Sequence, residues 1–184
     1  MKLSALPRPQ KWVLLGIPAL FAVGSFLHFL YDITGQTPVV GIFSPVNESI
    51  WEHSKMVLWP AILWWLLYYY LQGKAFGIDQ NSWFTAAFFS LLTTLATMPL
   101  VYYFYTEAFG VELLWVDILI LLLAVSLGQL LGLHIYRHTK GIPSIFVLLL
   151  FACVILLFIW FTFAPPQIPL FQDPVTGQYG IYAL

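Results

Sequence analysis

Residues 145–164 read IFVLLLFACVILLFIWFTFA, and no charged side chain interrupts this stretch. A helix of about 20 apolar residues is long enough to cross roughly 30 Å of hydrocarbon. Other parts of the chain share this character, so the sequence predicts about five membrane-spanning helices in an all-α integral membrane bundle. The expected spans are residues 12–31, 45–72, 83–105, 113–135 and 145–164.

The composition supports lipid as the main solvent of this chain. Hydrophobic residues make up 61% of the sequence and charged residues 8%, against about 45–50% and about 25% in soluble domains. We therefore expect a single transmembrane domain over residues 1–184. No basic stripe is present to neutralise phosphates, which excludes nucleic acid as a partner. A lone Cys153 excludes an intramolecular disulfide and a cysteine-based zinc site.

The basic residues predict how the chain is oriented. With five spans, all lysines and arginines except Lys55 fall on the side of the N-terminus, which is therefore predicted to be cytoplasmic. These residues are Lys2, Arg8, Lys11, Lys74, Arg137 and Lys140. Most acidic residues fall on the other side, where the C-terminal tail is also expected. The positive-inside rule does not account for that acidic bias, so a functional site on the outer side is one explanation.

Two ionisable residues lie within or beside apolar stretches. His28 stands near the outer end of the first span, and Asp117 lies between LLWV and ILILLL in the fourth. A carboxylate is costly in lipid, so Asp117 should face the bundle interior or a wet cavity. Counted by helix rise, His28 and Asp117 reach similar depths on different helices. They predict either a structural hydrogen bond between them or part of a wider functional site.

The segment FSPVNESIWEH, which ends at His53, brings further polar groups to the same side. Ser44 followed by Pro45 has the form of a helix cap and first helical position, so a helix is predicted to begin there. In such a helix Glu48 and Glu52 would share one face. A solvated first turn, favoured by the helix dipole, is the alternative interpretation of these carboxylates.

A divalent metal site is the more specific interpretation of this cluster. His28, His53 and Asp117 are the expected ligands, because imidazole and carboxylate groups suit zinc, iron or manganese. Glu48 and Glu52 are the expected catalytic carboxylates, able to act as general base on a metal-bound water. Alternatively, the same residues form a structural polar network or bind a cation without catalysis.

The remaining two histidines stand apart from this group. His134 and His138 form an HxxxH pair at the cytoplasmic end of the fourth span, beside Arg137. A spacing of four can bind metal on a helix. We expect solvated residues that complement the helix dipole instead, on the membrane side opposite His28 and His53.

Two further features concern packing. Gly128 and Gly132 form a GxxxG motif, which permits close helix approach within the bundle, in a homo-oligomer or with a membrane-complex partner. Residues 165–184 are rich in proline yet apolar, and they are expected to fold over the outer mouth of the bundle as a lid. Asp173 in this tail would then join the acidic cluster.

Three stretches together resemble a family of small bacterial multi-span membrane proteins grouped as a domain of unknown function. They are HFLYD at residues 28–32, the segment containing NESIWEH, and PPQIPLFQDPVTGQYG at residues 165–180. The resemblance implies a multi-pass protein of the bacterial plasma membrane and implies no chemistry.

Three functions remain open from the sequence. The first is a metal-dependent membrane enzyme, hydrolase-like, with its site facing outward. The second is a non-catalytic membrane protein or subunit of a larger assembly. A channel or transporter is disfavoured, because the inner half of the spans offers few polar groups to line a path.

Overall fold

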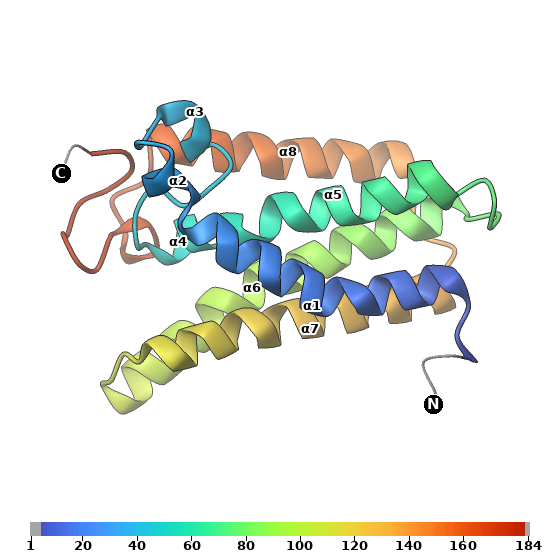
Figure 1. The fold of residues 1–184 in the computed structure, drawn as a ribbon, viewed down its shortest axis with the longest axis horizontal. Helices are drawn as coiled ribbons and strands as arrows, with labels where there is room; N and C mark the ends of the chain where they lie inside the picture. The colour runs from blue at the N-terminus through green and yellow to red at the C-terminus, as the bar shows by residue number, and fades with distance from the viewer. Residues whose placement is uncertain (1–4, 183–184) are drawn as a thin grey trace.

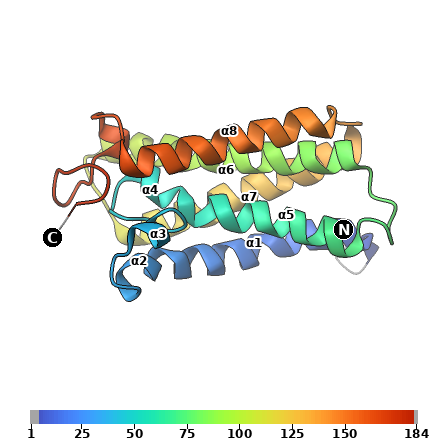
Figure 2. The same ribbon diagram turned by 90° about the horizontal axis from the view of Figure 1, so that it is seen from above.

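The structure, a computed structural model, describes residues 5–182. Five long helices lie side by side in an elongated bundle (Figures 1 and 2). They are α1 (Arg8–His28), α5 (Lys55–Gln72), α6 (Gln80–Phe109), α7 (Leu114–His138) and α8 (Ser144–Phe163). Residues 5–182 contain no strand beyond one isolated bridge between Gln172 and Tyr179, so the expected all-α class is confirmed.

Short elements gather at one end of the bundle, which we call the tail end. They are α2 (Leu30–Ile33), α3 (Pro38–Gly41), α4 (Ile50–His53) and the 3₁₀ helix η2 (Pro169–Phe171). The C-terminal tail lies at the same end, whereas the start of α1 and the loop from α5 to α6 lie at the far end (Figure 1).

Four helices, rather than the expected five, are long and apolar enough to cross a membrane by themselves. They are α1, α6, α7 and α8. The helix that falls short is α5, whose sequence KMVLWPAILWWLLYYYLQ includes a lysine, a glutamine and six Trp or Tyr side chains with polar atoms. Much of α5 is nevertheless buried between α1 and α6.

The helix predicted to begin at Ser44 and Pro45 does not form there. Residues 44–49 are irregular, and α4 begins at Ile50 with Ser49 as its cap. The cause is local hydrogen bonding. The Asn47 side chain accepts from Ser49 N at 2.9 Å, and the Ser49 hydroxyl accepts from Glu52 N at 3.3 Å. An asparagine turn thus competes successfully with the helix at this point.

Close approach of backbones joins α6 to α7. A Cβ on Gly128 would stand 2.1 Å from the Thr94 hydroxyl, and one on Gly132 would stand 2.9 Å from Ser90 Cβ. Both glycines of the GxxxG motif are therefore covered by α6 of the same chain. A homo-oligomer or complex partner stays a prediction.

Two separate contacts fix α1 against α5. The indoles of Trp12 and Trp64 stack at 4.0 Å, and each donates to the main-chain carbonyl of the other, at 3.1 and 3.2 Å. Nearer the tail end, a Cβ on Gly24 would stand 2.8 Å from the Met56 carbonyl oxygen. These contacts hold α1 and α5 close together at two separate points along their interface.

Candidate metal centre

Three of the residues expected in the site come together at the tail end. His28 is the last residue of α1, Glu48 lies in the irregular segment before α4, and His53 is the last residue of α4. Each offers one ligand atom, and these atoms all lie within 4.8 Å of one another. The irregular segment makes this possible, because it lets Glu48 turn back toward His53 instead of stacking with Glu52.

Hydrogen bonding orients the ring of His53. Its Nδ1 lies 3.1 Å from the main-chain carbonyl oxygen of Ser49, one helical turn earlier. A carbonyl can only accept, so Nδ1 must carry the hydrogen and donate it. The remaining nitrogen, Nε2, lies 3.3 Å from a carboxylate oxygen of Glu48. In neutral His53, two electron-pair acceptors would thus face each other, an arrangement that a proton or a metal cation would relieve.

His28 completes the group. Its ring stacks on that of His53 with centroids 5.1 Å apart and planes at 16°. Nδ1 of His28 is buried, and no residue within 5–182 forms a hydrogen bond with it. A buried nitrogen without a partner is costly, so this atom is a further ligand candidate.

The charge of the pair follows from its surroundings. The hydrogen bond with His53 lowers the pKa of Glu48 below its usual value, although partial burial opposes the shift. Burial by itself would lower the pKa of His53, but the hydrogen bond and charge of Glu48 outweigh it and raise that pKa. In the absence of a metal, the two therefore favour an ion pair.

The three residues line a cavity of about 560 Å³. Asp117 on α7 and Glu112 before it line the same cavity. Asp117 accepts a hydrogen bond from the Tyr105 hydroxyl at 2.6 Å, and Glu112 accepts one from Tyr102 at 2.8 Å. Asp117 thus shares the cavity with His28, but it lies outside the three-residue group.

Glu52 lies outside the three-residue group and does not line the cavity. It is buried and pairs with Lys55, three residues later, while its carboxylate also accepts from Val46 N at 3.0 Å. Lys55 in turn donates to the carbonyl of Gly41 at 2.7 Å. This buried pair ties the irregular segment to the start of α5, so Glu52 has a structural environment.

The tail reaches the same region. Pro174 and Val175 line the cavity, and the Asn47 side chain donates to the Gly180 carbonyl at 2.9 Å. Asp173 is buried and lies outside the three-residue group. It accepts from Val175 N at 2.8 Å and from the Thr176 and Tyr182 hydroxyls.

His134 and His138 lie at the far end, as expected. Their rings are 4.6 Å apart and exposed. The bundle separates them from the group at the tail end (Figure 1).

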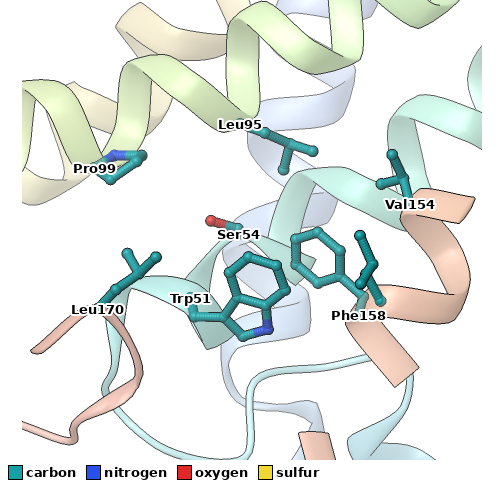
Figure 3. A pocket seen from close by; sticks show the side chains of 8 residues that line it. Trp51, Ser54, Leu95, Pro99, Val154, Phe158 and Leu170 are labelled. Atoms are coloured by element: carbon teal, nitrogen blue, oxygen red, sulfur yellow. The ribbon is translucent and has the colours of Figure 1, made fainter. Parts of the chain in front are cut away.

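A second cavity, of about 200 Å³, lies on the other side of α4 between α6 and α8. Figure 3 shows Trp51, Leu95 and Phe158 around it. None of its lining residues is titratable, so this cavity offers packing space and no metal chemistry.

A model of the family of unknown function DUF6512 matches residues 1–181. The chain belongs to this family. The DUF6512 match includes His28, Glu48 and His53 and runs into the tail, in agreement with the resemblance to an uncharacterised family. A bacterial origin and the family motifs stay predictions. No curated protein and no solved structure matches the chain.

The sequence did not indicate which residues donate hydrogen bonds to Asp117 and Glu112. Tyr105 and Tyr102 lie near the end of α6 and reach Asp117 and Glu112 across the turn into α7. The short connection between α6 and α7, which brings the ends of both helices together, was the available signal.

Proposed function

We propose that this membrane protein binds a divalent metal ion at His28, Glu48 and His53, and that the ion serves hydrolytic chemistry on a ligand in the adjoining cavity. One observation carries the proposal. The Ser49 carbonyl orients His53 so that its free nitrogen faces the Glu48 carboxylate at 3.3 Å. A cation between these two atoms satisfies both, and His28 supplies a third ligand.

The ligand set suits zinc, and it also suits iron or manganese. Two histidines and one carboxylate bind zinc in several hydrolases, and two histidines with a carboxylate also hold iron(II). Tetrahedral zinc bonds of about 2.0–2.2 Å place ligand atoms roughly 3.3–3.5 Å apart. The atoms within 4.8 Å here would therefore draw together on binding.

The hydrogen bond that orients His53 and the adjoining cavity both support a catalytic role. The hydrogen bond from His53 Nδ1 to a carbonyl is the usual way in which a metal-binding histidine is held. Three protein ligands leave a coordination position open to the cavity, where a metal would polarise a carbonyl or lower the pKa of bound water. Asp117 lies in that cavity as a potential proton acceptor.

A structural role without metal is the second candidate. The opposite pKa shifts of Glu48 and His53 favour an ion pair that would join the irregular segment to α4. The stacked ring of His28 weakens this candidate, because it places a second imidazole beside a protonated one.

The same proposal includes a bundle that crosses the membrane five times with the site outside. The chain returns toward the far end along α5, which lies beside α1 in the bundle (Figure 2). The basic residues at the far end support a cytoplasmic location for it. They are Arg8, Lys11, Lys74, Arg137 and Lys140, while Lys2 lies outside the described residues. The exception, Lys55, is buried in an ion pair.

Metal analysis of the purified full-length protein tests the proposal. We expect about one zinc, iron or manganese ion per chain, lost in His28→Ala and His53→Ala. The matched controls are His134→Ala and His138→Ala, which should keep the metal. A folded wild-type protein without metal, or equal losses in the controls, would overturn the proposal in favour of the structural role.

A further inference from the structure

The walls of the cavity divide into a small polar part and a larger apolar part. The polar part consists of the proposed ligands together with Asp117, Glu112, Tyr102 and Ser25. Deeper walls come from Met56, Met98 and Leu121, which are buried. A volume of about 560 Å³ falls within the range of about 300–1,000 Å³ for small-molecule sites.

Part of the rim of the cavity is exposed and apolar. Phe29, at the end of α1, is 57% exposed, and Ile118, in the first turns of α7, is 47% exposed. Glu48 and Glu112, which also line the cavity, are exposed as well. Because α1 and α7 are both apolar enough to cross a membrane, a rim formed by Phe29 and Ile118 would face acyl chains where these helices leave the bilayer.

The charges of the residues that line the cavity limit the kind of ligand that it can bind. None of the described residues that line the cavity is a lysine or an arginine, and Glu48, Glu112 and Asp117 are acidic. A phosphate or sulfate group would meet three carboxylates with only the proposed metal ion, and no basic residue, to offset them. A neutral carbonyl group, by contrast, needs only the metal ion and hydrogen-bond partners.

We propose that the cavity binds a neutral single-chain acyl amphiphile, an ester or amide that enters from the bilayer. Its carbonyl group reaches the metal ion, and its chain leaves between Phe29 and Ile118 into lipid. This inference rests on the proposed metal site and adds the class of ligand and its route.

Cobalt-loaded protein in phosphatidylcholine nanodiscs provides the test, because coordination changes the visible spectrum of bound Co²⁺. The probes are dodecanohydroxamic acid, which joins a metal-binding carbonyl group to an acyl chain, and acetohydroxamic acid, which has the same head and no such chain. Both should change the spectrum of the wild-type protein.

A larger side chain at the rim should weaken binding of dodecanohydroxamic acid and leave binding of acetohydroxamic acid unchanged. In Ile118→Trp we expect retained cobalt, an unchanged response to acetohydroxamic acid, and a requirement for about tenfold more dodecanohydroxamic acid, as overpacking of a binding site produces. The matched control is Leu119→Trp, an exposed neighbour on α7 that does not line the cavity. Phe29→Trp tests the opposite rim and replaces Ile118→Trp if that variant does not fold.

Each contrary result has its own meaning. A wild-type protein that binds no cobalt overturns the metal site and this inference with it. Bound cobalt with the same dodecanohydroxamic acid response in both rim variants overturns only the route. Dodecyl phosphate that displaces dodecanohydroxamic acid at a lower concentration than N-methyldodecanamide overturns the preference for a neutral head.

Discussion

Nε2 of His53 lies 3.3 Å from a carboxylate oxygen of Glu48, five residues earlier in the chain. The contact exists because residues 44–49 are irregular. Had the helix begun at Ser44, Glu48 would have lain beside Glu52, and the histidine would have lacked a carboxylate. The site therefore depends on the turn at Asn47 as much as on its ligands.

Carboxylate variants should distinguish a ligand from its neighbour. We expect Glu48→Gln to weaken metal binding by about 100-fold or more, since loss of even an outer partner costs about 10–100-fold. Asp117→Asn should retain a stoichiometric ion, because its carboxylate lies outside the group of three. Metal content after dialysis against a graded chelator measures both, and a greater loss in Asp117→Asn would restore Asp117 as a ligand.

The buried pair of Glu52 and Lys55 should matter for stability rather than for metal. Lys55→Met leaves a buried carboxylate unpaired, and such changes cost about 3–5 kcal/mol. Lys74→Met, at an exposed lysine of the far end, should change the unfolding midpoint little. Thermal unfolding in detergent compares the two. The double variant Glu52→Gln with Lys55→Met should be more stable than Lys55→Met alone, and no such recovery would mean that the charge is not the cause.

Much of the helical framework could be predicted because it depends on composition. The stretch at residues 145–164 gave α8 at Ser144–Phe163, within one residue at each end. The start of α7 at Leu114 also agrees within one residue with the span expected at 113–135, although the helix continues to His138, three residues further. Lipid leaves an apolar chain of this length few alternatives to a helix. The helix expected over residues 45–72 is irregular as far as residue 49, because polar side chains there form hydrogen bonds that compete with the helix.

Close packing of α7 on α6 should be sensitive to one methyl group. In Gly128→Ala the new Cβ would stand 2.1 Å from the Thr94 hydroxyl and 2.5 Å from the Ser90 carbonyl oxygen. Overpacking of this kind costs about 1–3 kcal/mol. Ala152→Val, on an exposed face of α8, is the control. Equal unfolding midpoints for both variants would show that α6 and α7 separate readily.

The tail should loosen in acid through Asp173. Burial alone would raise the pKa of Asp173, but hydrogen bonds from Tyr182, Val175 N and Thr176 lower it below the usual 3.8. A lowered pKa in the folded protein means that the stabilisation is present above the unfolded value of about 3.9 and is lost as the pH falls through the folded value. Tail attachment should therefore weaken below about pH 4.

Hydrogen exchange at the Val175 amide, corrected for the intrinsic rate, measures this loosening. Asp173→Asn should exchange faster at neutral pH and lose most of the acid dependence. Asp32→Asn, at an exposed carboxylate of the same end, should behave like the wild-type protein. Acid protection unchanged down to pH 3 would contradict the role of Asp173.

The finer parts of the site were beyond the sequence because they depend on side-chain choices between nearby partners. From the sequence, Glu52 could lie beside Glu48 on one helix face or pair with Lys55 three residues later. In the structure the Glu52 carboxylate is buried and pairs with Lys55. His28 and Asp117 line the same cavity, yet the depth expected from helix rise could not give the direction in which each side chain points.

The paired indoles of Trp12 and Trp64 have a mechanical consequence. Together with the close approach of Gly24 to Met56, they hold α1 and α5 together at two points along their lengths. His28 ends α1, and His53 lies two residues before α5 begins, so sliding of one helix along the other would change the distance between the two imidazoles. The tryptophan pair near one end of the bundle therefore limits how far the stacked histidines at the other end can move apart.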